Sequence, residues 1–166
     1  MSSQTPPELT MDIEDFALLC RESLPAAYEV ARQLGMDRGK PSMQSSEAVY
    51  RHCKRHFLGS TEERFVLLVL DGKHRMLSDH LISMGTVTTC LVHPREVMRK
   101  VLLQPGAAAF VVAHNHPSGD PEPSVEDKAV TRRLLACGST FGIPLLDHVV
   151  CGHTTWASLR THMTFK

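Results

Sequence analysis

The chain has 166 residues, of which 42% are hydrophobic and 22% charged, as in a globular protein that can bury a sizeable core. Its 18 Lys and Arg residues balance its 18 Asp and Glu residues, which argues against a field strong enough to recruit nucleic acid or an anionic membrane. The 5 cysteines contain no C-x-x-C pair, so neither a disulfide framework nor a cysteine-ligated zinc site is expected.

The N-terminal part, residues 1–42, is predicted to be a helical extension followed by a linker. Apolar residues at helical spacing predict a helix over 12–34, and Gly35 ends it. The stretch "GMDRGKPSMQSS" is polar and rich in Gly, Pro and Ser, which indicates a linker. The first residues, "MSSQTPPELT", lack the basic and apolar regions of a secretion signal, so a cytoplasmic protein is expected.

Residues 43–166 are predicted to form one α/β domain. An amphipathic helix is expected over 46–57, where the basic run "RHCKRH" is interpreted as a solvated face. The apolar run "RFVLLVLDG" at 64–72 predicts a buried strand that ends in a turn. The alternating, Thr- and Val-rich segment 84–92 predicts a second strand.

Helices and strands then alternate to the end of the chain. A helix is predicted over 93–106, with Pro94 near its start, followed by the strand "AAAFVVAH" at 107–114. A further helix runs from Ser124 to about Cys137, and 143–152 forms the last clear strand. This alternation is typical of a layered α/β fold.

The stretch "VVAHNHPSGDPEPSVEDKAV" carries a candidate metal site. His114 and His116 lie two residues apart in an extended segment, so their imidazoles face the same side while Asn115 points away. Ser124 and Asp127 form an S-x-x-D capping box at the start of the next helix, from which the Asp127 carboxylate can fold back toward the histidines.

Two imidazoles and one carboxylate would leave a coordination position of zinc open, as in catalytic sites. The alternative is that Ser124 and Asp127 only cap a helix while the two histidines lie exposed on a loop. H-x-H by itself is a weak signal, and the fixed offsets of Ser124 and Asp127 strengthen it. The same ligands also suit other divalent ions of the first transition row.

His114-x-His116, Ser124 and Asp127 together resemble the JAMM motif of the MPN-domain metalloproteins. Three segments resemble the RadC branch of that superfamily: "HNHPSGDPEPSVED", "GTVTTCLVHPREV" and "LLDHVVCG". The resemblance extends from the helix at 46–57 to the C-terminus. It implies an MPN/JAB-type α-β-α sandwich, layered as in cytidine deaminases, and one zinc ion per chain held by His114, His116 and Asp127.

The JAMM pattern also includes an upstream glutamate, for which Glu62 and Glu63 are candidates. The Glu-x-Phe of the family aligns with Glu63-Arg-Phe65, and strand alternation puts Glu63 on the same face as Phe65. We therefore expect Glu63 to be the general acid/base and Glu62 to be solvated. By resemblance, Ser124 would donate a hydrogen bond to the oxyanion of a tetrahedral intermediate.

Asp147 and His148 lie in an apolar segment, so at least one of them should be buried. A buried carboxylate there could orient a metal-binding imidazole from behind. A hydrogen-bonded structural pair is the alternative.

The leading hypothesis for function is a zinc-dependent JAMM-type hydrolase that cleaves a peptide or isopeptide bond. The alternative is an accessory module that binds DNA or protein on an MPN scaffold, with weak or no catalysis. RadC proteins are associated with DNA repair and carry a helix-hairpin-helix module, for which residues 1–42 are too short. A zinc deaminase ranks last because H-x-E and P-C-x-x-C do not occur. No membrane partner is expected, and no feature of the sequence defines an oligomeric state.

Overall fold

The computed structural model describes residue 30, residues 40–85 and residues 92–165. The chain divides into a unit of Met1–Lys40 and a unit of Pro41–Lys166, and every element described below belongs to the second unit. The predicted helix over 12–34 and most of the predicted strand over 84–92 lie outside the described residues and stay predictions. None of the described helices is both long and apolar enough to cross a membrane.

A mixed five-stranded sheet forms the centre of the second unit, with its strands in the order β2-β1-β3-β4-β5. The strands are β1 (Arg64–Leu70), β2 (Met76–Met84), β3 (Ala109–Asn115), β4 (Leu145–Cys151) and β5 (Trp156–Ser158). β3 and β4 are parallel, whereas the other neighbouring strands are antiparallel.

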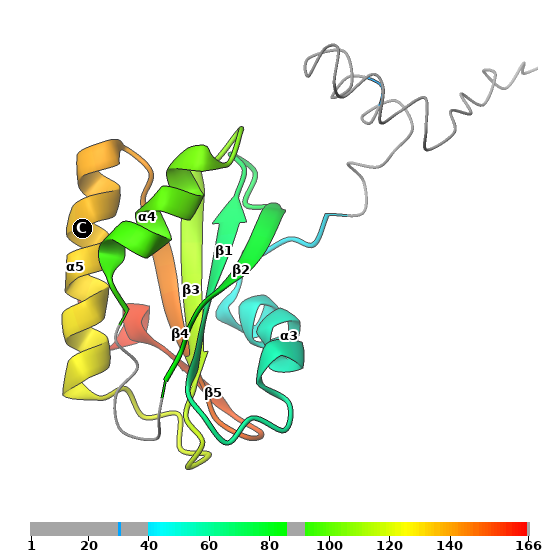
Figure 1. Ribbon diagram of the computed structural model, residues 1–166, viewed down its shortest axis with the longest axis vertical. Helices are drawn as coiled ribbons and strands as arrows, with labels where there is room; N and C mark the ends of the chain where they lie inside the picture. Colours follow the sequence, from blue (N-terminus) through cyan, green and yellow to red (C-terminus); the bar gives the residue numbers. More distant parts are fainter. Residues whose placement is uncertain (1–29, 31–39, 86–91, 166) are drawn as a thin grey trace, which may run out of the picture. The chain divides into compact units, whose positions relative to one another are not determined.

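Helices cover both faces of this sheet. They are α3 (Ser46–Phe57), α4 (Pro94–Leu103) and α5 (Val125–Phe141), and a short 3-10 helix, η1 (Leu159–Thr161), follows β5. Figure 1 shows α3 on one face and α4 and α5 on the other. The predicted α/β class and α-β-α sandwich are therefore confirmed.

Two apolar clusters hold the layers together, and alternation along β1 divides its side chains between them. Val66 and Leu68 pack with Val49 of α3, whereas Leu67 packs with Leu134 of α5. All five of these residues are 1% exposed or less. β1 is covered on both faces, which explains why it is a continuous apolar run.

The edge strand β2 was not predicted, although β1 was. Its sequence "MLSDHLISM" mixes polar with apolar residues, and each of its side chains is half-buried or exposed. A strand paired on one side only needs no continuous apolar run, so its sequence resembles a loop.

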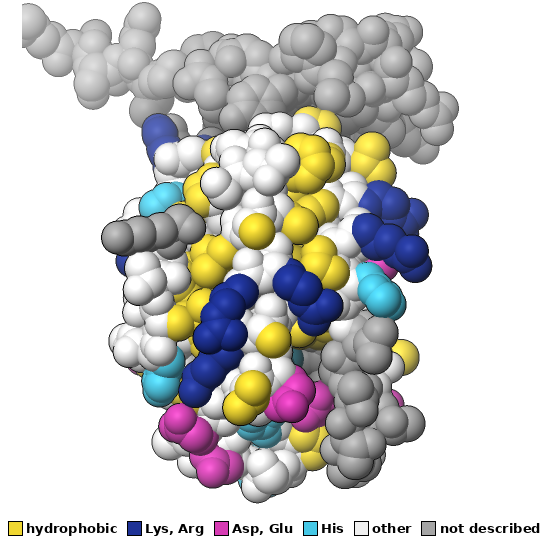
Figure 2. All heavy atoms as spheres, turned by 90° about the vertical axis from the view of Figure 1, so that its left-hand side faces the viewer, with side chains coloured by type: hydrophobic (Ala, Val, Ile, Leu, Met, Phe, Trp, Pro, Cys, Tyr) yellow, Lys and Arg dark blue, Asp and Glu magenta, His cyan; other side chains and the backbone are white. Residues whose placement is uncertain are grey.

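The ends of α5 are set by local interactions. Ser124 caps its N-terminus, and Gly142, with φ 67°, ends it in the left-handed conformation that favours glycine. The helix therefore continues to Phe141, beyond the predicted end near Cys137. Figure 2 faces this side of the molecule and shows basic side chains lying beside apolar ones; Arg132 and Arg133 of α5 are exposed.

Candidate metal centre

Side chains from two consecutive elements meet at the carboxyl end of β3. The Nε2 atoms of His114 and His116 lie 3.1 Å apart. The Asp127 carboxylate of α5 approaches both, with Oδ1 at 3.0 Å from Nε2 of His114 and Oδ2 at 3.4 Å from Nε2 of His116. The three side chains thus offer donor atoms within 4.8 Å of one another, close enough to hold a metal ion together.

The three side chains of the centre differ in their exposure to solvent. His114 is 2% exposed, whereas the side chains of His116 and Asp127 are each 15% exposed. The Phe65 ring of β1 stacks against His114 with the ring centroids 6.1 Å apart. One of these side chains is therefore fixed in the core, and the other two border the surface.

The proton on His116 is placed by the loop that follows. Its Nδ1 lies 2.7 Å from the backbone carbonyl oxygen of Asp120. A carbonyl can only accept a hydrogen bond, so Nδ1 of His116 carries the hydrogen. In the neutral ring, Nε2 then presents its lone pair toward His114 and Asp127.

The proton on His114 is placed by a buried chain of hydrogen bonds. The Thr131 hydroxyl donates to the backbone carbonyl of Asp127 at 2.6 Å, so its oxygen accepts from Nδ1 of His148, also at 2.6 Å. Nε2 of His148 is left as an acceptor, and Nδ1 of His114 donates to it at 2.8 Å. Nε2 of His114 consequently also presents a lone pair to the centre.

Two imidazole lone pairs and a carboxylate therefore face one another, an arrangement that needs a cation or a proton between them. Without a metal, a proton fulfils this role: hydrogen bonding to Asp127 is the largest influence that raises the pKa of His116. Burial opposes ionisation of Asp127, but its close contacts with His114 and His116 outweigh burial and hold the pKa of its carboxyl well below the usual range. Oriented Nε2 atoms backed by second partners are what zinc sites require, so the donors fit a divalent ion.

Asp147 does not have the orienting role considered for it. Strand alternation puts Asp147 on the α3 side of β4, where its carboxylate accepts hydrogen bonds from Ser46 at 2.7 Å and from Ser158 at 2.8 Å. The next residue, His148, points to the other side and contacts His114. Burial lowers the pKa of His148 well below its usual value, so it remains a neutral partner.

Glu63 and Glu62 differ as strand alternation predicts. The antiparallel register pairs Phe65 with His114, and Glu63 directly precedes β1, two residues before Phe65. Glu63 is half-buried and Glu62 is exposed. Hydrogen bonding to Asp127 raises the pKa of His116 most, and the charge of Glu63 also raises it.

Ser124 forms the expected capping box with Asp127. Its hydroxyl oxygen accepts from the Asp127 backbone N–H at 3.0 Å, and its own backbone N–H donates to Asp127 Oδ2 at 2.8 Å. The hydroxyl hydrogen is directed to the same Oδ2 at 2.7 Å. Donation to a substrate would therefore require this hydrogen to leave Asp127.

Two contributors to the centre were not found from the sequence. Thr131 follows Asp127 by four residues, and this i, i+4 spacing on a helix was a usable signal. The carbonyl of Asp120 had no such signal, because any residue type offers the same backbone oxygen.

The α-β-α sandwich around this mixed five-stranded sheet is consistent with the JAB/MPN class of domains. The model of a RadC-like JAB domain matches residues 43–164, and the chain belongs to this family.

Curated relatives occur in bacteria and archaea. The chain is 41% identical over 138 residues to a UPF0758 protein of Syntrophotalea carbinolica, covering 82% of this chain and 60% of the relative. It is 40% identical over 158 residues to one of Trichormus variabilis, covering 94% and 64%, and 37% identical over 137 residues to one of Methanosarcina mazei, covering 81% and 59%. The chain thus spans about three-fifths of the length of these relatives.

Proposed function

We propose that the protein is a zinc-dependent hydrolase of JAMM type that cleaves a peptide or isopeptide bond. The observation that supports this most strongly is the convergence of two oriented Nε2 lone pairs with the Asp127 carboxylate at a partly open edge. When bound, zinc would polarise the scissile carbonyl and make a water molecule acidic near neutral pH.

Each surrounding residue then has a defined task. Glu63 would take the proton of the attacking water and deliver it to the leaving amine, which requires a carboxylate beside the centre rather than in it. Ser124 would donate its hydroxyl hydrogen to the developing oxyanion. For that donation, the hydrogen would have to leave Oδ2 of Asp127, its present acceptor.

A groove that His116 borders supports an extended peptide chain as the substrate class. It has a volume of about 230 Å³, and His116 forms part of its wall. Phe57, Leu58 and Pro117 supply apolar surface, while Lys54 adds a positive charge. Apolar surface with a few polar groups is typical of sites that bind peptides and other ligands.

The test compares Glu63→Gln with Glu62→Gln, two variants that remove the same charge from neighbouring positions. Each protein is loaded with zinc, and its metal content is measured. Cleavage is then followed with a library of fluorogenic peptides that includes isopeptide-linked lysines. We expect Glu63→Gln to lose about 10²- to 10⁴-fold in rate with its zinc content unchanged, and Glu62→Gln to behave as wild type.

Two outcomes would contradict the proposal. Full activity of Glu63→Gln would remove Glu63 from the mechanism. A zinc-loaded wild type that cleaves no member of the library would favour the accessory module, which binds DNA or protein on the same scaffold.

A further inference from the structure

We propose that the protein has a second divalent-metal site, formed by His52 and His56 of α3 and Asp79 of β2. It is separate in sequence and in the fold from the candidate centre at His114. The ion it fits best is zinc or a similar first-row transition metal.

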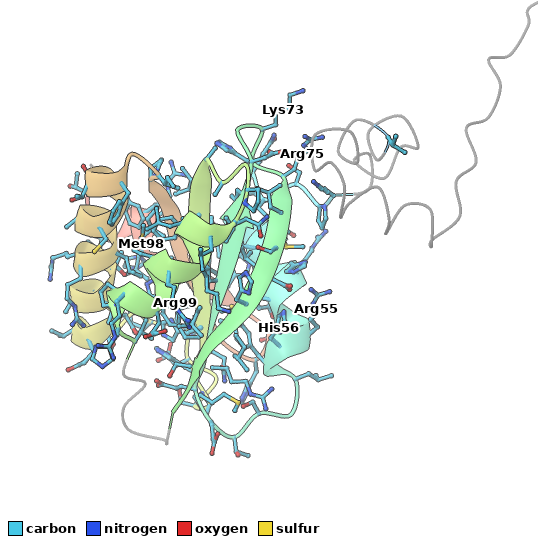
Figure 3. All side chains as sticks on the ribbon, turned by 45° about the horizontal axis from the view of Figure 1, so that its top comes forward. Arg55, His56, Lys73, Arg75, Met98 and Arg99 are labelled. Carbon is cyan, nitrogen blue, oxygen red and sulfur yellow. The ribbon has the colours of Figure 1, made fainter. Side chains whose placement is uncertain are left out.

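The three side chains are brought together by one helix and one edge strand. His52 and His56 are four residues apart, so their imidazoles share one face of α3. Their Nε2 atoms lie 3.0 Å and 2.9 Å from Oδ2 of Asp79, and donor atoms of all three residues lie within 4.8 Å of one another. Figure 3 shows His56 and Arg55 on α3, next to β2.

Arg55 shows that this position attracts a cation. Its guanidinium contacts Oδ2 of Asp79 and approaches Nε2 of His52 to 3.0 Å, while its Nε lies 3.4 Å from Nε2 of His56. The Arg55 side chain is 59% exposed, so it can swing out into solvent. The imidazole of His52, at 10% exposed, is the better fixed part of the cluster.

No single protonation state of either imidazole satisfies both of its contacts, the one with Arg55 and the one with Asp79. Nε2 of His52 lies 3.0 Å from both an Arg55 nitrogen, which only donates, and an Asp79 oxygen, which only accepts when ionised. A protonated Nε2 serves Asp79 and repels Arg55; an unprotonated one does the reverse. Nε2 of His56 has the same conflict. A divalent ion in place of the guanidinium would bond to His52, His56 and Asp79 and so remove this conflict.

The ligand set also explains why the basic run at 51–56 contains histidines. A solvated helix face was predicted there, and Arg51 and Arg55 conform to it, with side chains 76% and 59% exposed. His52 and His56 instead turn toward β2, with side chains 10% and 25% exposed. A metal there would fasten α3 to β2, the strand at the edge of the sheet among the described residues.

The experiment measures zinc stoichiometry by titration of the metal-free full-length protein with Zn²⁺ alone. We expect wild type to bind one equivalent more than the His52→Ala/His56→Ala variant. His93→Ala is the matched control: His93 is exposed and makes no side-chain cap hydrogen bond, so this variant should bind as wild type. Arg55→Ala should bind at this site roughly tenfold more tightly, because a competing cation is gone.

The variant His114→Ala/His116→Ala distinguishes the two metal sites. It should still bind the equivalent of zinc that His52→Ala/His56→Ala loses. Failure of the candidate centre alone would therefore leave the second site intact. Equal stoichiometry in wild type and His52→Ala/His56→Ala would overturn the second site. If that variant does not fold, Asp79→Asn preserves the side-chain shape and is tested by the same zinc titration. It should bind one equivalent less than wild type.

Discussion

Replacing Thr131 by valine tests the chain of hydrogen bonds behind the candidate metal centre. Valine keeps the shape of threonine and removes only the hydroxyl, which is fully buried and links His148 to the Asp127 carbonyl. Nδ1 of His148 would then have a hydrogen and no acceptor. A buried polar group left without its partner costs about 1–3 kcal/mol, and we expect that loss in the free energy of unfolding.

The same change should weaken zinc binding. Without Thr131, His148 can move its hydrogen to Nε2, which lies 2.8 Å from Nδ1 of His114. His114 would then have to shift its own hydrogen to Nε2, the atom that faces the metal. Loss of such outer partners weakens metal binding by about 10- to 100-fold.

Thr140→Val provides the control within the same helix. Thr140 also donates to the carbonyl four residues earlier, at 2.9 Å, but it is exposed and distant in sequence from the site. Urea unfolding of the metal-free proteins and competition titration with a zinc chelator give the two readouts. If Thr131→Val matches wild type in both, the hydroxyl does not set the proton positions, and the orientation argued for His114 is wrong.

Two further predictions concern the turn after β1 and the loop that holds His116. Burial raises the pKa of Asp71, but hydrogen bonds from Arg75 outweigh the effect of burial and lower the pKa overall. Asp71→Asn should therefore reduce the free energy of unfolding by about 1 kcal/mol at neutral pH. Because the folded pKa lies below the unfolded value, the difference from wild type should be present above about pH 4 and disappear as the pH falls through the folded pKa, which urea unfolding at several pH values would show. A Cβ at Gly152 would collide with the carbonyl oxygen of Gly119. Gly152→Ala should therefore reduce the free energy of unfolding by about 1–3 kcal/mol and weaken zinc binding, because the Asp120 carbonyl would move. Unchanged zinc affinity would show that the loop does not position His116.

Local sequence was sufficient for the parts of the site that lie close together in the chain. His114 lies at the end of β3 and His116 directly follows that strand, and the capping box at Ser124 turns Asp127 back over the loop. Each of these features depends on residues within one turn or one strand, where spacing alone determines which side chains share a face. For the same reason, the predicted bounds of α3 and of the apolar strands lie close to those of the structure.

Strand pairing and layer packing decided the remainder. Phe65 reaches His114 because β1 pairs with β3, and His148 reaches His114 because β4 lies parallel to β3, across 34 residues of sequence. The edge strand β2, which supplies Asp79 to α3, has no apolar periodicity to reveal it. Contacts of this kind depend on which surfaces bury one another in the folded chain, and periodicity along a segment indicates the buried face but not its partner.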